Sequence, residues 1–302
     1  MKSENAPSEN GLALRPRRSA LYMPGANARA LEKARGLDAD CLLLDLEDAV
    51  APDAKETARE QICAALQEGG YGARELVVRV NALDTPWGKD DMAALGDLPE
   101  AARPHAILAP KISTPEQIDA LMARLPEGCA LWIMVETPEA IFNIEKLAAK
   151  AADTPLAAFV MGTNDLAKEI RAALVKGRAP LMTALSLALL AARHYGLSVL
   201  DGVFNDIADE EGFEAECRQG ADMGFDGKTL IHPSQLAVCN GVFAPSEDEL
   251  AQARDVVAAF AAPENAGKGV LKVNGKMTEL LHRDMAARLL AIDAAIAARQ
   301  QA

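Results

Sequence analysis

Two carboxylates at the ends of apolar runs are the first residues in this sequence that could do chemistry. The run 131–135 leads directly into Glu136, and the run 156–161 is followed closely by Asp165. Short apolar runs of this kind favour strands that are buried on both faces, as in a parallel sheet. A carboxylate is costly to bury there unless it is paired or binds a metal. The two residues therefore predict a functional site.

The ligand atoms of this pair indicate which metal to expect. Glu136 and Asp165 offer only oxygen, and no Cys or His joins them, so we expect Mg²⁺, with Mn²⁺ as a second possibility. The alternative is helix capping, which is the usual role of a single carboxylate at a strand end. Asp165 could cap the segment LAKEIRAAL, and Glu136 immediately precedes the cap candidate Thr137.

Other strand-like runs also end in charged residues, which are Asp45, Glu47, Asp48, Arg79, Lys111, Asp201, Lys228 and His232. Arg79 offers a planar fork for a carboxylate or a developing oxyanion. A divalent metal beside an arginine suits the binding of a 2-hydroxy or 2-oxo acid, with the metal as Lewis acid. This combination predicts carbon–carbon cleavage or formation through an enolate. Two alternatives remain. Arg79 could be a structural ion-pair partner, and the acidic segment DLED (residues 45–48, called the DLED loop below) could pair with Arg or Lys.

These residues must be positioned by strands, and eight strand-like runs alternate with helical patterns. The runs are 19–23, 41–46, 76–80, 106–110, 131–135, 157–161, 197–202 and 227–231. Eight such units predict an α/β fold, a (β/α)₈ TIM barrel over residues 17–245. In this fold the carboxyl ends of all strands meet at one mouth, where the chemistry takes place.

The segments outside the barrel carry their own signals. Residues 1–16 are polar and predict a flexible tail. A capping box from Ser246 to Glu249 starts a helix, and Asn274-Gly275 predicts a tight hairpin, followed by a last Ala/Leu-rich helix. We expect residues 246–302 to form a hairpin-plus-helix extension that covers an active site, in its own subunit or a neighbour's.

Composition limits the class of protein. The 302 residues are 50% hydrophobic, enough for a large core, and the formal net charge of −13 argues against a nucleic-acid partner. No apolar run approaches the length of a membrane span. The five cysteines are odd in number and contain no C-x-x-C pair, which favours reduced thiols in a cytoplasmic protein.

The segments LLLDLEDAVAPDAKETAR, VRVNALDTPWG, MVETPEAI, MGTNDLAKEI and GKTLIHPSQL occur in this order. Together they resemble the citrate lyase beta-subunit-like (HpcH/HpaI aldolase) family, which includes relatives such as malyl-CoA and citramalyl-CoA lyases. The resemblance covers residues 17–285. It implies a Mg²⁺-dependent (β/α)₈ carbon–carbon lyase that acts on an acyl-CoA thioester, releases acetyl-CoA and a small 2-oxo acid, and is commonly a homotrimer.

The resemblance also implies roles for individual residues. Glu136 and Asp165 would bind the metal, and Arg79 would bind the acid end of the substrate. The remaining substrate and coenzyme A contacts that it implies are Tyr22, Lys33, Asn164, Ile231 and His232. Without the resemblance, Tyr22 would be interpreted as packing at the barrel bottom and Lys33 as a helix surface charge.

One position departs from the family pattern. Lyases of this family usually carry an Asp after the hairpin, whereas NGKMTEL places Glu279 there. Glu279 is our candidate for the acid that protonates the acetyl-CoA enolate, and Glu47 in the DLED loop is the second candidate for proton transfer. Two other functions remain open: a citrate lyase beta subunit that acts on an acyl-carrier-protein thioester, and a metal- and ligand-binding homologue without turnover.

Overall fold

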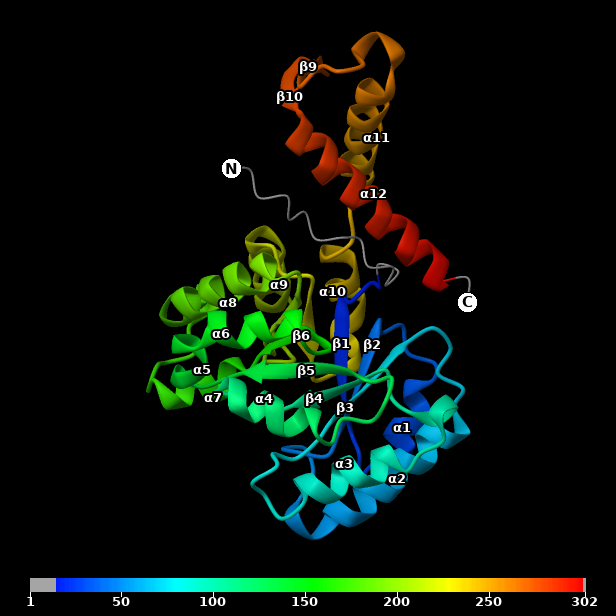
Figure 1. Cartoon of the computed structure of the whole chain (residues 1–302), viewed down its shortest axis with the longest axis vertical. Helices are drawn as coiled ribbons and strands as arrows, with labels where there is room; N and C mark the ends of the chain where they lie inside the picture. Colours follow the sequence, from blue (N-terminus) through cyan, green and yellow to red (C-terminus); the bar gives the residue numbers. More distant parts are fainter. Residues whose placement is uncertain (1–14, 301–302) are drawn as a thin grey trace. The chain divides into compact units, whose positions relative to one another are not determined.

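The computed structural model describes residues 15–300, so the predicted tail lies almost wholly outside the described residues. Eight parallel strands form a closed barrel in sequence order, and β1 pairs with β8 to close it (Figure 1). The strands are β1 Ser19–Pro24, β2 Cys41–Asp45, β3 Glu75–Arg79, β4 Ala106–Ala109, β5 Ala130–Val135, β6 Leu156–Met161, β7 Ser198–Asp201 and β8 Gly227–Leu230. The predicted barrel is confirmed, and each strand falls within two residues of its predicted run.

Helices connect the strands and surround the barrel (Figure 1). They are α1 Ala28–Ala34, α2 Lys55–Glu68, α3 Gly88–Gly96, α4 Pro115–Met122, α5 Pro138–Phe142, α6 Ile144–Ala149, α7 Thr163–Glu169, α8 Met182–His194, α9 Glu210–Met223 and α10 Leu236–Val242. Short 3₁₀ segments include η4 Lys176–Leu181 and η5 Pro233–Gln235. A capping box begins α4, where Gln117 Oε1 accepts from the backbone nitrogens of Ser113 and Thr114 at 2.7 and 3.0 Å.

The barrel interior explains why certain charged residues reach the mouth. Side chains alternate between the two faces of a strand, so residues two apart point the same way. Three interior apolar residues are each followed, two positions later, by a charged one. The pairs are Leu43 with Asp45, Val77 with Arg79, and Met134 with Glu136. The same alternation that fills the barrel therefore points these three charges inward at its carboxyl end.

The chain divides into two compact units, Arg17–Phe243 and a second one that contains Ala244–Ala302. The second unit begins with α11 (Glu247–Ala261), whose capping box between Ser246 and Glu249 forms as predicted. The hairpin follows as β9 (Val270–Val273) and β10 (Lys276–Glu279), and its turn residues Asn274 and Gly275 have φ of 49° and 80°. Helix α12 (Leu280–Gln300) ends the described chain.

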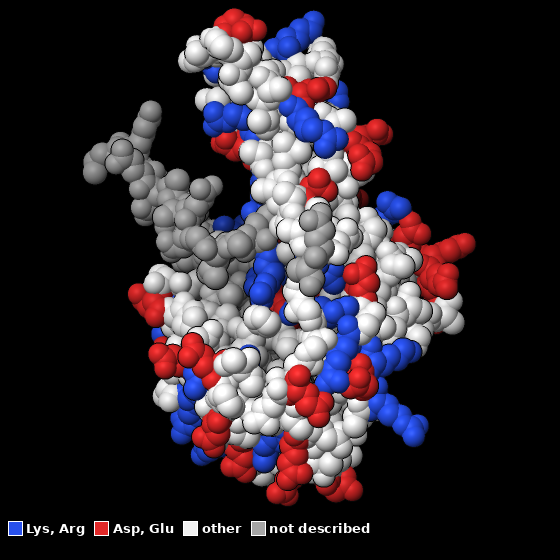
Figure 2. Space-filling view, turned by 90° about the vertical axis from the view of Figure 1, so that its right-hand side faces the viewer, with Lys and Arg blue, Asp and Glu red and all other residues white. Residues whose placement is uncertain are grey.

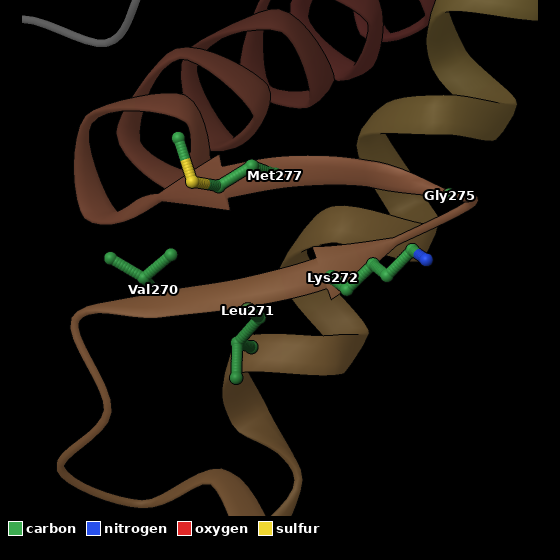
Figure 3. A pocket seen from close by; sticks show the side chains of 5 residues that line it. All are labelled: Val270, Leu271, Lys272, Gly275 and Met277. Carbon is green, nitrogen blue, oxygen red and sulfur yellow. The ribbon is translucent and has the colours of Figure 1, made fainter.

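The C-terminal unit has a small core and a large apolar surface of its own. Four of its apolar residues form a buried cluster, namely Ala253, Val256, Val273 and Ala286. Five large apolar side chains are exposed on the same unit, namely Val270, Met277, Leu280, Leu281 and Met285. Figure 3 shows Val270 and Met277 among the side chains that line a shallow hollow of the hairpin. Val270 and Met277 therefore form an exposed apolar patch, as interaction sites often do.

The surface charge, the helix lengths and the cysteines can be described for residues 15–300. On the face drawn in Figure 2, basic and acidic side chains are interspersed. Among residues 15–300, no helix combines the length and the apolar character needed to cross a membrane. All five cysteines are free, and four of them are buried.

Candidate active site

Glu136 lies at the barrel mouth, where the lack of a side chain at Gly162 leaves room for it. It directly follows β5 and is 3% exposed, and its Oε1 accepts a hydrogen bond from the backbone nitrogen of Lys111 at 2.6 Å. A Cβ added to Gly162 would lie 2.4 Å from Glu136 Oε2. The cap of α5 is Thr137, whose Oγ1 accepts from the backbone nitrogen of Ala140 at 3.0 Å. Glu136 is therefore not needed as a cap.

Asp165 lies in the first turn of α7, after the N-cap residue Gly162, and that cap makes no side-chain hydrogen bond. The alternative that Asp165 itself is the N-cap is thus wrong. Its side chain is 32% exposed, and Oδ2 lies 3.4 Å from Lys111 Nζ. Lys111 therefore links the two predicted metal ligands, through its backbone to Glu136 and through its ammonium to Asp165.

The DLED loop after β2 joins the same cluster. Glu47 Oε1 accepts from Lys111 Nζ at 2.8 Å, and Glu47 Oε2 lies 2.9 Å from Arg79 Nη1. The ion pairs that the sequence left open as an alternative for this loop are therefore present.

The fork of Arg79 is already occupied. Its Nε and Nη2 donate to Asp45 Oδ1 and Oδ2 at 2.7 and 2.6 Å, and Asp45 is fully buried. Asp45 takes both parallel hydrogen bonds of this fork, so the predicted contact of Arg79 with a substrate carboxylate would have to use another nitrogen. Nη1 is the terminal nitrogen that Asp45 does not engage.

Lys55 fixes the backbone of the DLED loop through hydrogen bonds. This buried lysine at the start of α2 donates from Nζ to Leu46 O and Glu47 O at 2.7 Å each, and to Asn81 Oδ1 at 2.8 Å. Burial lowers the pKa of Lys55, while the Asp45 and Glu47 carboxylates oppose that shift. The three acceptors fix the backbone at Glu47 and hence the place of its carboxylate.

We expect the substitution Lys55→Met to lower the free energy of unfolding by about 2 kcal/mol, because it leaves buried acceptors without a donor. Urea denaturation monitored by circular dichroism would measure this change. Lys89→Met, an exposed lysine on α3, removes the same charge and serves as the control. Equal stability of the two variants would show that the loop does not depend on Lys55.

Tyr22 lies beside Arg79 of the carboxylate cluster. The other four residues predicted to contact the substrate or coenzyme A have different neighbours. The Arg79 guanidinium carbon lies 4.6 Å from the centre of the Tyr22 ring, so the barrel-bottom interpretation of Tyr22 is wrong. Lys33 is exposed on α1. Asn164 and Asn205 exchange two side-chain hydrogen bonds, of 3.0 and 2.8 Å.

The two residues after β8 lie at its carboxyl end, and both are exposed. His232 caps η5, because its Nδ1 accepts from the backbone nitrogen of Ser234 at 3.2 Å. The backbone nitrogen of Ile231 donates to Gln235 Oε1 at 3.0 Å. The local role of His232 in this structure is therefore helix capping.

Asp201 and Lys228, which the sequence placed at the mouth, face the helices instead. Arg178 Nη1 donates to both oxygens of Asp201 at 2.6 and 2.7 Å, and Lys228 Nζ bonds Asp201 and Glu216 at 3.1 and 2.7 Å. Asp201 lies two residues after Val199, which packs in the outer core, so it shares the outward face. This buried group of charges fastens η4 and α9 to the barrel.

Glu279 belongs to the C-terminal unit. It ends β10, is half-buried, and its backbone nitrogen donates to His282 Nδ1 at 3.0 Å.

The mouth has an excess of negative charge. Burial and the nearby Glu47 carboxylate raise the pKa of Glu136 to about 7. Burial also raises the pKa of Glu47, although Arg79 opposes the shift. Burial lowers the pKa of Lys111, but its hydrogen bond to Glu47 outweighs this and the net direction is upward. Each shift indicates that a further cation would stabilise the ionised carboxylates.

Curated relatives match nearly the whole chain. It is 48% identical over 283 residues to the (3S)-malyl-CoA thioesterase of Cereibacter sphaeroides (strain KD131 / KCTC 12085), which covers 94% of this chain and 96% of the relative. It is 35% identical over 271 residues to citrate lyase subunit beta of Escherichia coli (strain K12), with 88% and 89% covered. It is 31% identical over 280 residues to the mitochondrial citramalyl-CoA lyase of Homo sapiens, with 88% and 82% covered.

Solved structures agree with these relatives. The protein CitE from Mycobacterium tuberculosis, in complex with magnesium, acetoacetate and coenzyme A, has a TM-score of 0.74 and 29% identity and covers 93% of this chain and 100% of CitE. Residues 175–295 match the C-C bond lyases of the TIM-barrel fold. Since residues 18–233 match HpcH/HpaI aldolase/citrate lyase, the chain belongs to this family.

Proposed function

We propose that the chain is an enzyme that acts on a 3-hydroxy-3-carboxyacyl-CoA, of the malyl-CoA or citramalyl-CoA type, and cleaves its carbon–carbon bond between C2 and C3. The products would be acetyl-CoA and a 2-oxo acid, glyoxylate or pyruvate. The observation that carries the proposal is the cluster of Glu136, Asp165, Glu47 and Arg79 at the carboxyl end of the barrel. Such a cluster suits the hydroxy-acid end of the substrate.

The residues of the mouth fit Mg²⁺, which the CitE relative binds. Glu136 and Asp165 would hold the ion through oxygen, the ligand type that it prefers. Among residues 15–300 no group of three or more His, Cys, Asp or Glu side chains forms a metal site, so water and substrate would fill the other positions. When bound, Mg²⁺ would supply Lewis-acid polarisation of the substrate oxygens. The raised pKa of Glu136 supports this fit, because a cation would favour its ionised form.

The chain's own residues would move the protons. Arg79 Nη1 would donate a hydrogen bond to the substrate carboxylate, and Glu47 would accept the proton of the C3 hydroxyl. The electrons of the O–H bond form the new carbonyl of the 2-oxo acid, and those of the C2–C3 bond pass to the acetyl-CoA enolate. Glu279 would then donate a proton to the enolate carbon, which completes acetyl-CoA.

We propose that the exposed apolar face of the C-terminal unit covers a barrel mouth, in its own subunit or in a neighbour of a homotrimer. Glu279 lies between two of these apolar residues in sequence, Met277 and Leu280, and would be delivered with them. The coenzyme A and substrate contacts proposed at this mouth are Tyr22, Lys33, Asn164, Ile231 and His232. A cytoplasmic location would keep the five free thiols reduced.

A second candidate is hydrolysis of the same thioester, which the relative named (3S)-malyl-CoA thioesterase favours. Glu279 would then accept a proton from the water that attacks the thioester carbonyl carbon. The C–S bond would break with its electrons on sulfur, and Glu279 would return the proton to that sulfur, releasing coenzyme A and the free hydroxy acid. The Glu side chain is one methylene longer than the family's Asp, which leaves a different distance between carboxylate and thioester.

One experiment separates these functions. The purified protein with Mg²⁺ would be incubated with malyl-CoA and citramalyl-CoA, and the products followed by mass spectrometry. Acetyl-CoA together with glyoxylate or pyruvate supports the lyase, whereas coenzyme A together with malate or citramalate supports hydrolysis. Turnover of an acyl-carrier-protein thioester alone would favour a citrate lyase beta subunit, which the 35% identical relative represents. Binding without turnover of any thioester would contradict an enzyme.

We expect Glu136→Gln and Asp165→Asn each to abolish measurable Mg²⁺ binding in calorimetry, because each removes an anionic oxygen ligand. Glu139→Gln, an exposed carboxylate on α5, removes the same charge without touching the cluster and serves as the control. Retained affinity in both site variants would make the two carboxylates structural.

A further inference from the structure

Lys111 contacts three carboxylates of the mouth, those of Glu47, Glu136 and Asp165, although the family motifs assign it no role. Its backbone nitrogen donates to Glu136 Oε1 at 2.6 Å, and its Nζ donates to Glu47 Oε1 at 2.8 Å. The same Nζ lies 3.4 Å from Asp165 Oδ2. One residue thus contacts both proposed metal ligands and their acidic neighbour Glu47.

The backbone at Lys111 is held in an uncommon conformation. Its φ is +56°, in the left-handed region that residues other than glycine rarely adopt. Such conformations persist where surrounding contacts require them, and they occur often at functional sites. Here the short bond from the Lys111 backbone nitrogen to Glu136 is such a contact. The position of the lysine is therefore fixed by its backbone, independently of where the ammonium lies.

The side chain, in contrast, is free to change partners. It is 48% exposed, and a lysine ammonium is a mobile point charge on a four-carbon stem with three donors. A divalent cation held by Glu136 and Asp165 would lie beside the same Asp165 carboxylate that the ammonium now approaches. Two cations at one carboxylate repel each other.

We propose that Lys111 is an internal counter-ion of the carboxylate cluster, and that a divalent cation bound at Glu136 and Asp165 displaces its ammonium from Asp165. This inference rests on the proposed metal site. In the metal-free protein the ammonium offsets repulsion among the three carboxylates and holds them in place. When the metal binds, the ammonium leaves Asp165, and the backbone bond to Glu136 remains.

The displacement can be tested first on the unchanged protein. Limited acylation with acetic anhydride, with and without Mg²⁺, would be followed by peptide mass spectrometry. We expect Mg²⁺ to increase the acylation rate of Lys111 relative to Lys168, an exposed lysine on α7. An unchanged or lower relative rate at Lys111 in a protein that binds Mg²⁺ would overturn the proposal.

The second test compares two variants by calorimetry with Mg²⁺. Lys111→Met should bind the ion about fivefold more tightly than Lys168→Met, since a partly exposed ion pair is worth about 1 kcal/mol. Both variants lose one positive charge near the site, so their difference isolates the contact with Asp165. Equal or weaker binding by Lys111→Met overturns the proposal, whereas Mg²⁺ binding by the unchanged protein tests the proposed function separately. Absence of Mg²⁺ binding by the unchanged protein would overturn the proposed metal site and the counter-ion proposal with it.

Discussion

The variant Glu279→Ala is expected to turn over malyl-CoA about 10²–10⁴-fold more slowly than the unchanged protein, with Mg²⁺ binding unaffected. This is the usual contribution of a general acid or base. The reason lies in the proposed chemistry, because both C–C cleavage and thioester hydrolysis need one carboxyl group beside the thioester. Steady-state turnover at matched metal occupancy would measure the effect.

Two further variants make the Glu279 prediction specific. Glu279→Asp restores the shorter side chain that the family usually carries, so cleavage of malyl-CoA should stay equal or rise. Glu264→Ala removes an exposed carboxylate from the same C-terminal unit and should leave turnover unchanged. If all of these proteins agree within about a factor of two, Glu279 is a surface carboxylate. Glu47 is then the next residue to test as the proton donor.

The variant Arg79→Lys is expected to bind oxalate, an analogue of the 2-oxo acid, more weakly by about 2 kcal/mol, because it loses the charge-assisted hydrogen bond that Nη1 would donate to the acid. It should also unfold more readily. An ammonium cannot reproduce both bonds to Asp45, which is fully buried and needs compensation for its charge. Complete loss of one partner in a buried ion pair costs about 3–5 kcal/mol, and a lysine retains only part of the interaction. Calorimetry with oxalate and urea denaturation measure the two effects.

Arg59→Lys is the matched control for Arg79. Arg59 Nε bonds the buried carboxylate of Asp91 at 2.8 Å, outside the carboxylate cluster. This control should lose stability without losing oxalate affinity. If Arg79→Lys behaves in the same way as the control, Arg79 is a structural residue that holds Asp45 and has no contact with the substrate.

The barrel could be predicted because its signals are local. Apolar runs of four to six residues, capping boxes and the Asn274-Gly275 turn each act over a few residues, and all of them form in the structure. The alternation of faces also explains why Arg79 and Glu136 point into the barrel. Convergence of strand ends at one mouth then follows from the fold alone.

The choice of ion-pair partners could not be predicted, because it depends on contacts between distant strands. Arg79 bonds Asp45 from the neighbouring strand, and Lys55 reaches the DLED loop from α2. Asp201 and Glu136 both follow an apolar run in the sequence. Asp201, however, occupies an outward-facing position of its strand, and its side chain points toward α9. Counting residues from the interior positions of each strand would have distinguished the two cases.

The two tryptophans have different surroundings. Trp132 is fully buried inside it, with the Arg17 guanidinium carbon 4.8 Å from its ring centre. Trp87 is half-buried just before α3, and the Nζ of Lys55 lies 5.3 Å from its ring centre. Indole emission depends on the charges and water around the ring. A Trp132→Phe variant would therefore report on opening of the DLED loop through Trp87, while Trp87→Phe would report on unfolding of the barrel interior.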